Sequence, residues 1–273
     1  MLGKTFDNLR EKTPLVHNIT NYVTVNDVAN MVLACGASPI MADDLEEVEE
    51  ITAICDGLCI NIGTLNKRTI DAMIVAGKKS KELGHIVLLD PVGAGASRLR
   101  TSTAIRILDE VKPDIIRGNI SEIKTLAIGS GNTKGVDADV ADSVTEDNLD
   151  EMIAFAKEFA TRIGAIVAIT GAIDLVSDGR QCCIIKNGTK EMGKVTGTGC
   201  QLSALTTAFA IANRDDKFHS TVAAVCSMGL AGEIALSLQQ DTDGNSTYRN
   251  RIIDAIYNMN GNILDKGAKY EFR

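Results

Sequence analysis

The 273-residue chain has the composition of an ordinary globular protein, with 45% hydrophobic and 23% charged residues. We expect one α/β domain over residues 1–273, because folds of this class and size often form a single unit with a large core. The net charge of -8, with no block of Lys and Arg, argues against a nucleic-acid-binding protein. The first residues form no apolar leader and no run of 18 apolar residues occurs, so we expect a cytoplasmic protein without a membrane span.

The chain contains seven cysteines, an odd number, and most have apolar neighbours, as in Cys182-Cys183-Ile184-Ile185. We expect reduced and mostly buried thiols, as in a reducing compartment. Cys55 and Cys59 have the spacing of one helix face. However, Asp56-Gly57 between them indicates a turn, and no matching pair of His or Cys lies nearby, so we predict no zinc site there.

Short apolar segments alternate with longer segments of helical periodicity over the first 170 residues. The patterns predict strands at 15–19, 59–63, 85–90, 114–117 and 165–170, and helices over 24–35, 66–83 and 146–162. Strands separated by helices of this length form βαβ units. The sequence therefore predicts an α/β fold with a mostly parallel central sheet and helices on both faces.

The pattern changes after residue 170. Residues 174–185 predict two strands around an Asp178-Gly179 turn. After Gly199 the chain is predicted to be mostly helical to about residue 260, and residues 130–145 are predicted to be a loop.

The segment Val195-Thr196-Gly197-Thr198-Gly199-Cys200 precedes a run of helix-forming residues. Small residues at the start of a helix leave its first N–H groups free, and the helix dipole is positive there, so this segment predicts an anion-binding site. A phosphoryl group in transfer is such an anion. The side chain of Cys200 would lie beside it.

Polar residues follow several of the predicted strands. Asp90, Arg117 with Glu122, and Thr170 each stand at or just beyond a strand end. Ligands of parallel sheets bind beyond the carboxyl ends of the strands, so we expect these side chains to meet at one edge. The carboxylates suit Mg²⁺, directly or through its waters. The arginine and the helix N-terminus suit a transferring phosphoryl group, and the set therefore predicts phosphoryl transfer.

These segments together resemble the hydroxyethylthiazole kinase family of the ribokinase-like superfamily. The resemblance covers about residues 4–260. It is carried by the segments 14–21, 36–41, 90–93, 117–122 and 195–200. It implies phosphorylation of the hydroxyl group of 4-methyl-5-(2-hydroxyethyl)thiazole by ATP with Mg²⁺, in thiamine salvage. It also implies a homotrimer with the thiazole site near the subunit interface.

The resemblance also implies residue roles. Cys200 takes the position where the wider superfamily usually has an Asp base. The implied contacts are Gly197, Met41, Asn21 and Val23 for the thiazole, Arg117 and Thr170 for ATP, and Asp90 and Glu122 for Mg²⁺. Because a free thiol has a pKa of about 8.5, we expect Cys200 to position the alcohol more than to deprotonate it.

Each of these residues also has a purely structural interpretation. Glu122 lies three residues after Asn119, the spacing of a capping box. Asp90 would cap a turn, Arg117 would pair with a surface acid, and Cys200 would only open a helix. His17, in an apolar strand, is predicted to be a core histidine. The acidic run 43–50 is predicted to be the exposed start of a helix.

Other functions remain open from the sequence. One is a ribokinase-like kinase for hydroxymethylpyrimidine or pyridoxal, and another is an ATP-dependent dehydratase that repairs hydrated NAD(P)H. If Cys200 is inert, the protein could be a non-catalytic nucleotide-binding module. A dinucleotide-dependent oxidoreductase is disfavoured, because Gly93-Ala94-Gly95 lacks the third glycine of the fingerprint.

Overall fold

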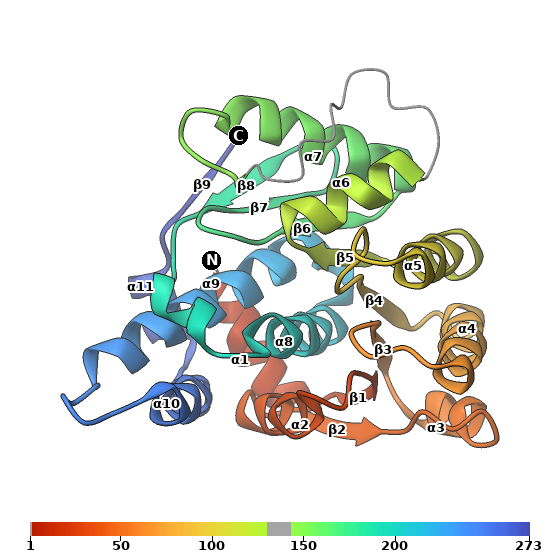
Figure 1. Ribbon diagram of the computed structural model, residues 1–273. Helices are drawn as coiled ribbons and strands as arrows, with labels where there is room; N and C mark the ends of the chain where they lie inside the picture. The colour runs from red at the N-terminus through yellow and green to blue at the C-terminus, as the bar shows by residue number, and fades with distance from the viewer. Residues whose placement is uncertain (1, 130–142) are drawn as a thin grey trace.

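The computed structural model describes residues 2–129 and 143–273 (Figure 1). A single mixed sheet runs through these residues in the order β2-β1-β3-β4-β5-β6-β7-β8-β9. The strands from β2 to β6 in that order are parallel, and β7, β8 and β9 are added antiparallel. The predicted mostly parallel sheet is therefore confirmed. The strands are β1 (Leu15–Ile19), β2 (Ser38–Met41), β3 (Gly57–Asn61), β4 (Ile86–Asp90), β5 (Ile115–Gly118), β6 (Ile166–Ile169), β7 (Asp174–Ser177), β8 (Cys182–Ile185) and β9 (Tyr270–Phe272).

Helices cover both faces of the sheet, as predicted (Figure 1). Successive residues of a strand point to opposite faces, so Leu88 packs into one apolar core and Leu89 into the other. The first face carries α1 (Leu2–Lys12), α2 (Val25–Ala34), α8 (Thr198–Ala212), α9 (Lys217–Ser237), α10 (Asn245–Asn258) and α11 (Gly261–Gly267). The second carries α3 (Val48–Ile54), α4 (Lys67–Glu82), α5 (Arg98–Val111), α6 (Ile120–Gly129) and α7 (Leu149–Ile163).

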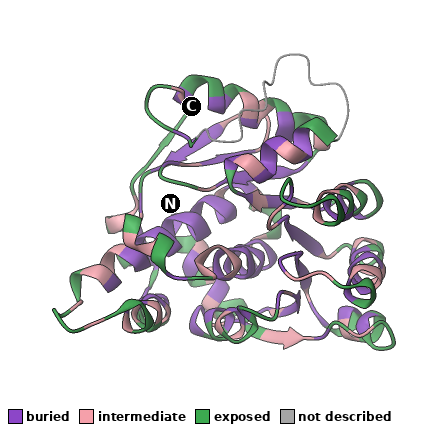
Figure 2. Ribbon diagram, in the orientation of Figure 1, coloured by how far each residue is buried: buried purple, intermediate pink, exposed green. Residues whose placement is uncertain are grey.

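Helices α8 and α9 are buried along most of their length (Figure 2). Both are apolar around their whole circumference, which is typical of a helix enclosed on all sides. The segment Arg214–Ser237 is long and apolar enough to cross a membrane, but 78% of its most apolar window is buried inside the protein. It is the central core helix of this fold.

The strand order reverses beside β1. The chain leaves β1 through α2 on one face to reach β2, then returns through α3 on the other face to β3. Such a reversal opens a crevice at the carboxyl ends of the two neighbouring strands, where ligands of α/β sheets bind. Asn21 follows β1 and Asn61 ends β3, so both lie at this crevice.

The predicted strands and helices are confirmed to within a few residues, but one turn is wrong. Gly57 is the first residue of β3 rather than part of a turn. The glycine there serves packing, because an added Cβ would lie 2.6 Å from Ile211 Cδ1 of α8. Strands β2 and β9 were not predicted from the sequence. Both are edge strands of only four and three residues with exposed or half-buried side chains, so they are too short to show a clear strand periodicity. Most of the predicted loop 130–145 lies outside the described residues.

The seven cysteines are free thiols, as predicted. Six of them are buried and Cys200 is half-buried. Asp178 and Gly179 form the predicted turn between β7 and β8, with Asp178 Oδ1 accepting the N–H groups of Arg180 and Gln181 at 2.8 and 2.9 Å.

Candidate active site

Two glycines shape the N-terminus of α8 for different reasons. Gly197 is the N-cap residue with φ +89°, and an added Cβ would lie 2.5 Å from Thr24 Cγ2. Gly199 lies in the first turn, where an added Cβ would lie 2.5 Å from Arg117 Nη1. A glycine cap has no side chain to accept the first N–H groups of the helix, so they remain available to an anion.

Arg117 stands at the end of β5, directly over this helix start. Its side chain is 13% exposed and its Nη1 lies 3.7 Å from Asp90 Oδ2. Nη2 donates a hydrogen bond to Thr170 Oγ1, at the end of β6. The suggestion that Arg117 pairs with a surface acid is wrong, because its acidic partner is fully buried. One cation thus connects the ends of three neighbouring strands.

Asp90 ends β4 and is completely buried. Its Oδ2 accepts hydrogen bonds from Asn61 Nδ2 and Ser203 Oγ, both at 2.8 Å. Its Oδ1 has no hydrogen-bond partner within the described chain. Burial raises the pKa of this carboxyl to about 6, although Arg117 opposes the shift. Asp90 does not cap a turn, since its partners are side chains from β3 and α8.

Glu122 closes the predicted capping box at the start of α6. Its Oε2 accepts the N–H of Asn119, and Asn119 Oδ1 accepts the N–H of Glu122, both at 2.8 Å. The second oxygen, Oε1, accepts the N–H of Gly93 at 2.8 Å. The predicted capping box is therefore confirmed. The carboxylate also holds the loop after β4 in place beside Asp90, and each oxygen keeps a further lone pair for a metal-bound water.

Cys200 lies at the crevice between β1 and β3. Its Sγ accepts a hydrogen bond from Asn21 Nδ2 at 3.2 Å. Burial, and then the negative charge of Asp90, raise the pKa of the thiol above its ordinary value. The thiol is therefore neutral near pH 7, because its ordinary pKa is already about 8.5. This agrees with a group that positions the alcohol more than it deprotonates it.

Asn61 connects the buried Asp90 with Asn21 and was not singled out from the sequence. It donates to Asp90 from Nδ2, and its Oδ1 accepts from Asn21 Nδ2 at 3.0 Å and from the N–H of Gly63 at 2.9 Å. Ser203 was also missed. A polar residue in a fully buried strand needs a partner, so Asn61 at the end of an apolar run was the available signal.

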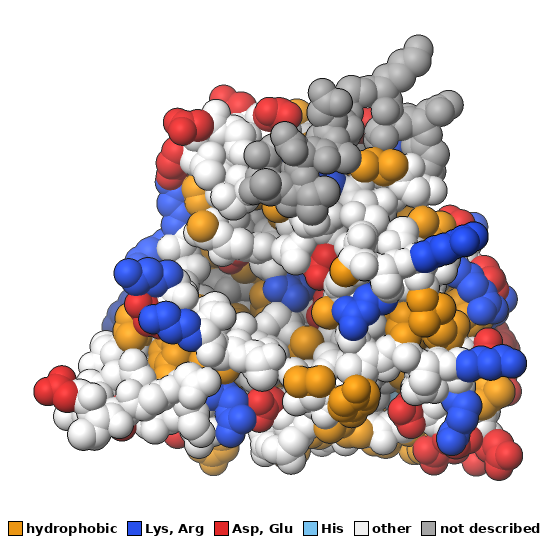
Figure 3. All heavy atoms as spheres, viewed as in Figure 1, with side chains coloured by type: hydrophobic (Ala, Val, Ile, Leu, Met, Phe, Trp, Pro, Cys, Tyr) orange, Lys and Arg blue, Asp and Glu red, His pale blue; other side chains and the backbone are white. Residues whose placement is uncertain are grey.

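The expected thiazole residues surround the other side of the α8 start. Asn21 is buried, with Oδ1 accepting from the N–H and Oγ1 of Thr24. Met41 ends β2 and is half-buried, while Val23 is 57% exposed. Tyr22, beside Val23, is 79% exposed. Hydrophobic side chains gather near α2 and β1 on the face shown in Figure 3.

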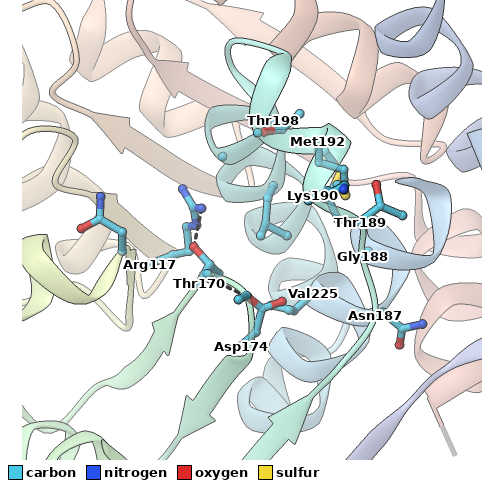
Figure 4. A pocket seen from close by; sticks show the side chains of 18 residues that line it. Arg117, Thr170, Asp174, Asn187, Gly188, Thr189, Lys190, Met192, Thr198 and Val225 are labelled. Carbon is cyan, nitrogen blue, oxygen red and sulfur yellow. Dashed lines mark hydrogen bonds between the residues drawn. The ribbon is translucent and has the colours of Figure 1, made fainter. Parts of the chain in front are cut away.

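A cavity of about 530 Å³ opens on the side of Arg117 and Thr170 (Figure 4). Its walls come from the ends of β5 and β6, the start of β7, the segment 187–193, and helices α8 and α9. Arg117, Thr198 and Gly199 form a polar, cationic end. Leu202, Val225 and Met228 supply an apolar wall. The size suits a ligand as large as a nucleotide.

His17 and the acidic run 43–50 take no part in this arrangement. His17 is buried, with Nδ1 3.1 Å from Thr52 Oγ1 and Nε2 2.8 Å from the carbonyl oxygen of Ala42, which confirms the core histidine. The acidic run is mostly exposed, and α3 begins within it at Val48. No group of three or more potential metal ligands was found among residues 2–129 and 143–273.

The fold and the site define a ribokinase-like kinase. Pyridoxal kinase from Staphylococcus aureus, solved with AMP-PCP and pyridoxal, shares the fold with a TM-score of 0.61 at 14% identity, over 95% of this chain and 98% of that one. The model of the hydroxyethylthiazole kinase family matches residues 6–262. The chain belongs to this family.

Individual relatives agree with the family match. The chain is 58% identical to hydroxyethylthiazole kinase from Clostridium acetobutylicum over 99% of both proteins. It is 52% identical to that of Clostridium beijerinckii, over 98% of this chain and 96% of the relative. The structure of hydroxyethylthiazole kinase from Pyrococcus horikoshii is similar, with a TM-score of 0.88 and 35% identity over 100% of this chain and 98% of that one. The resemblance inferred from the sequence motifs is confirmed.

Proposed function

We propose that this protein transfers the γ-phosphoryl group of ATP to the hydroxyl group of 4-methyl-5-(2-hydroxyethyl)thiazole, in thiamine salvage. The observation that carries the proposal is the start of α8, which has no side-chain cap. The guanidinium group of Arg117 lies against it at Gly199, and the buried Asp90 lies beside Arg117. Preorganised donors of this kind stabilise the charge of a phosphoryl group in transfer. The curated relatives carry the same activity in their names.

ATP would occupy the cavity of about 530 Å³, with its phosphates toward Arg117 and Thr170. Arg117 is already held by Thr170 and Asp90, so its guanidinium is preorganised for phosphate oxygens. The free N–H groups after Gly197 would receive the transferring phosphoryl group. A kinase of the same fold has been solved with AMP-PCP, which supports a nucleotide in this class of site.

Mg²⁺ fits the donor set around Asp90. The buried Oδ1 of Asp90 lacks a partner, and an unpaired buried carboxylate oxygen is costly unless a ligand or water satisfies it. Mg²⁺ typically takes one or two carboxylates together with substrate phosphates and waters. Asp90 would hold the ion, with Glu122 acting through water, and the bound ion would neutralise charge on the phosphates.

The acceptor alcohol would lie at the crevice, beside Cys200, with Asn21, Val23, Met41 and Gly197 around the thiazole. The neutral Cys200 thiol would orient the hydroxyl group toward the start of α8. Little base assistance is needed, because transition states of phosphoryl transfer are loose.

A homotrimer would complete the thiazole site. Tyr22 and Val23 are large, exposed apolar residues that directly follow the buried Asn21. A second copy over this edge would shield them and close the site. Light scattering in solution tests the trimer. A cytoplasmic location agrees with the seven free thiols.

The test is ADP release from Mg-ATP with hydroxyethylthiazole, with hydroxymethylpyrimidine and pyridoxal as alternative acceptors. Thiazole-dependent ADP supports the proposal. ADP only with another alcohol would retain the kinase and reject the substrate. If no alcohol yields ADP, hydrated NADH is supplied with ATP, and its conversion to NADH would identify a dehydratase instead.

A further inference from the structure

Asp174 is the single acidic residue among the described residues that line the 530 Å³ cavity. It begins β7, four residues after Thr170. Figure 4 shows it in the cavity wall between the Arg117–Thr170 pair and Val225. None of the proposed roles uses this carboxyl group, although it lines the cavity proposed for ATP.

The two oxygens of Asp174 have different surroundings. Oδ1 accepts the N–H of Gly171 at 2.8 Å, which ties the short turn between β6 and β7. Oδ2 has no hydrogen-bond partner within the described residues, and it is not among the fully buried polar atoms that lack one. The residue is half-buried, so Oδ2 is an acceptor that a ligand in the cavity can reach. Burial raises the pKa of the group to about 7, although the N–H of Gly171 and the charge of Arg117 oppose the shift.

A carboxylate in a nucleotide site repels the phosphates, so it has to face a hydrogen-bond donor of the ligand. ATP offers donors at two places, the ribose hydroxyl groups and the exocyclic amine of adenine. The apolar wall of Leu202, Val225 and Met228 suits the flat base. Asp174 stands between Val225 of that wall and the Arg117–Thr170 pair, where the sugar would join the base to the phosphates (Figure 4).

We infer that Asp174 accepts a hydrogen bond from a ribose hydroxyl group of ATP and makes the enzyme selective for ribonucleotides over deoxyribonucleotides. Carboxylates read ribose hydroxyls in the same way in other nucleotide sites. The inference rests on the proposed ATP-dependent function. It makes Asp174 a specificity-determining residue, which is not among the site residues implied by the family resemblance.

The test combines removal of the Asp174 carboxylate from the protein with removal of a ribose hydroxyl group from the nucleotide. Dissociation constants of ATP, 2′-deoxy-ATP, 3′-deoxy-ATP and ITP, which lacks the exocyclic amine, are measured by titration calorimetry, each at a low and a high Mg²⁺ concentration. The proteins are wild type, Asp174→Ala and Asp174→Asn. Asp150→Asn is the matched control, because Asp150 has a 90% exposed side chain and pairs with Arg273 on the surface.

We expect wild type to bind ATP about tenfold more tightly than at least one deoxy analogue, as one charged hydrogen bond allows. In Asp174→Ala this preference should fall to within about twofold, and in Asp150→Asn it should be unchanged. A ratio of dissociation constants does not depend on the fraction of folded protein. Asp174→Asn keeps an acceptor for Gly171 should the alanine variant fold poorly.

Three results would overturn the inference. The first is a wild type that binds both deoxy analogues as tightly as ATP. The second is a preference for ATP that survives in Asp174→Ala. The third is a change in the ATP-to-ITP ratio or in the Mg²⁺ dependence of Asp174→Ala, which would assign Asp174 to the base or to the metal. Failure of the proposed function is recognised separately, since wild type would then bind nucleotide without releasing ADP in the presence of the thiazole.

Discussion

Gly199 and Arg117 occupy the same small volume at the start of α8. An added Cβ on Gly199 would lie 2.5 Å from Arg117 Nη1, so the guanidinium group crosses the helix where a side chain would normally stand. The sequence motif alone suggests that glycine frees the backbone. The structure adds a second reason, since the glycine also admits the cation beside the helix dipole.

We predict that Gly199→Ala lowers affinity for ATP without lowering stability. The residue has ordinary helical backbone angles, so alanine is tolerated there, but Arg117 must move. The KM for ATP should rise about tenfold, with the melting temperature unchanged within error. Steady-state kinetics and thermal unfolding check both parts.

Gly197→Ala is the contrasting variant. At φ +89°, with Thr24 Cγ2 2.5 Å from the added Cβ, alanine should cost about 2 kcal/mol in the free energy of unfolding. Urea unfolding measures this loss. If Gly199→Ala and Gly197→Ala lower the free energy of unfolding equally, the two glycines do not have the different roles proposed for them, contact with Arg117 and backbone conformation.

Asp90 is predicted to make stability depend on pH. Burial raises its pKa from 3.8 to about 6. The folded state then binds more protons than the unfolded chain between these values, so this contribution to stability is lost as pH rises through about 6. The loss is about 3 kcal/mol. Asp90→Asn cannot ionise, so the free energy of unfolding of wild type, taken relative to this variant, should fall by about 2 kcal/mol from pH 4 to pH 7 in urea unfolding.

The same group is predicted to govern activity in the opposite sense. A carboxylate that holds Mg²⁺ has to be ionised, so kcat/KM should rise with pH through about 6 and then level off. Asp90→Asn should lower kcat at least about a hundredfold at all pH values, because it removes the charge that holds the ion. A variant with normal kcat would remove Asp90 from the metal site.

Asn61 is predicted to position both Asp90 and Asn21. Asn61→Ala should cost about 3 kcal/mol in unfolding free energy, because two buried side chains lose a partner. Asn61→Asp places a second carboxyl beside Asp90, so the acid limb of kcat/KM should move about one pH unit higher. Asn30→Ala is the control, since that exposed amide bonds only to Asn26. An unmoved acid limb would leave Asn61 a purely structural residue.

Cys200 is predicted to be replaceable by aspartate. A carboxylate at this position accepts the same hydrogen bond from Asn21 and is a stronger base than the neutral thiol. Cys200→Asp should keep or raise kcat, and Cys200→Ala should lose no more than about tenfold, because loose transition states need little base help. A thousandfold loss in Cys200→Asp would contradict a shared role for this position.

Much of the site was predictable because parallel strands end at a common edge. Asp90, Arg117 and Thr170 follow different strands in the sequence and come together in the structure, with Arg117 contacting both others. The residues missed, Asn61, Ser203 and Asp174, carry no motif. Their importance depends on what lies opposite them, which is set by chain segments up to 113 residues away.

The sequence by itself determined most of the strands and helices, the family and the glycine-rich start of α8, because periodicity and glycine placement are local properties. Only the tertiary structure decided the protonation behaviour of the buried groups at the site. Burial of Asp90 and Cys200 in the crevice raises both of their pKa values, and it leaves one oxygen of Asp90 without a partner. Desolvation depends on every element packed around a group, so no local pattern can report it.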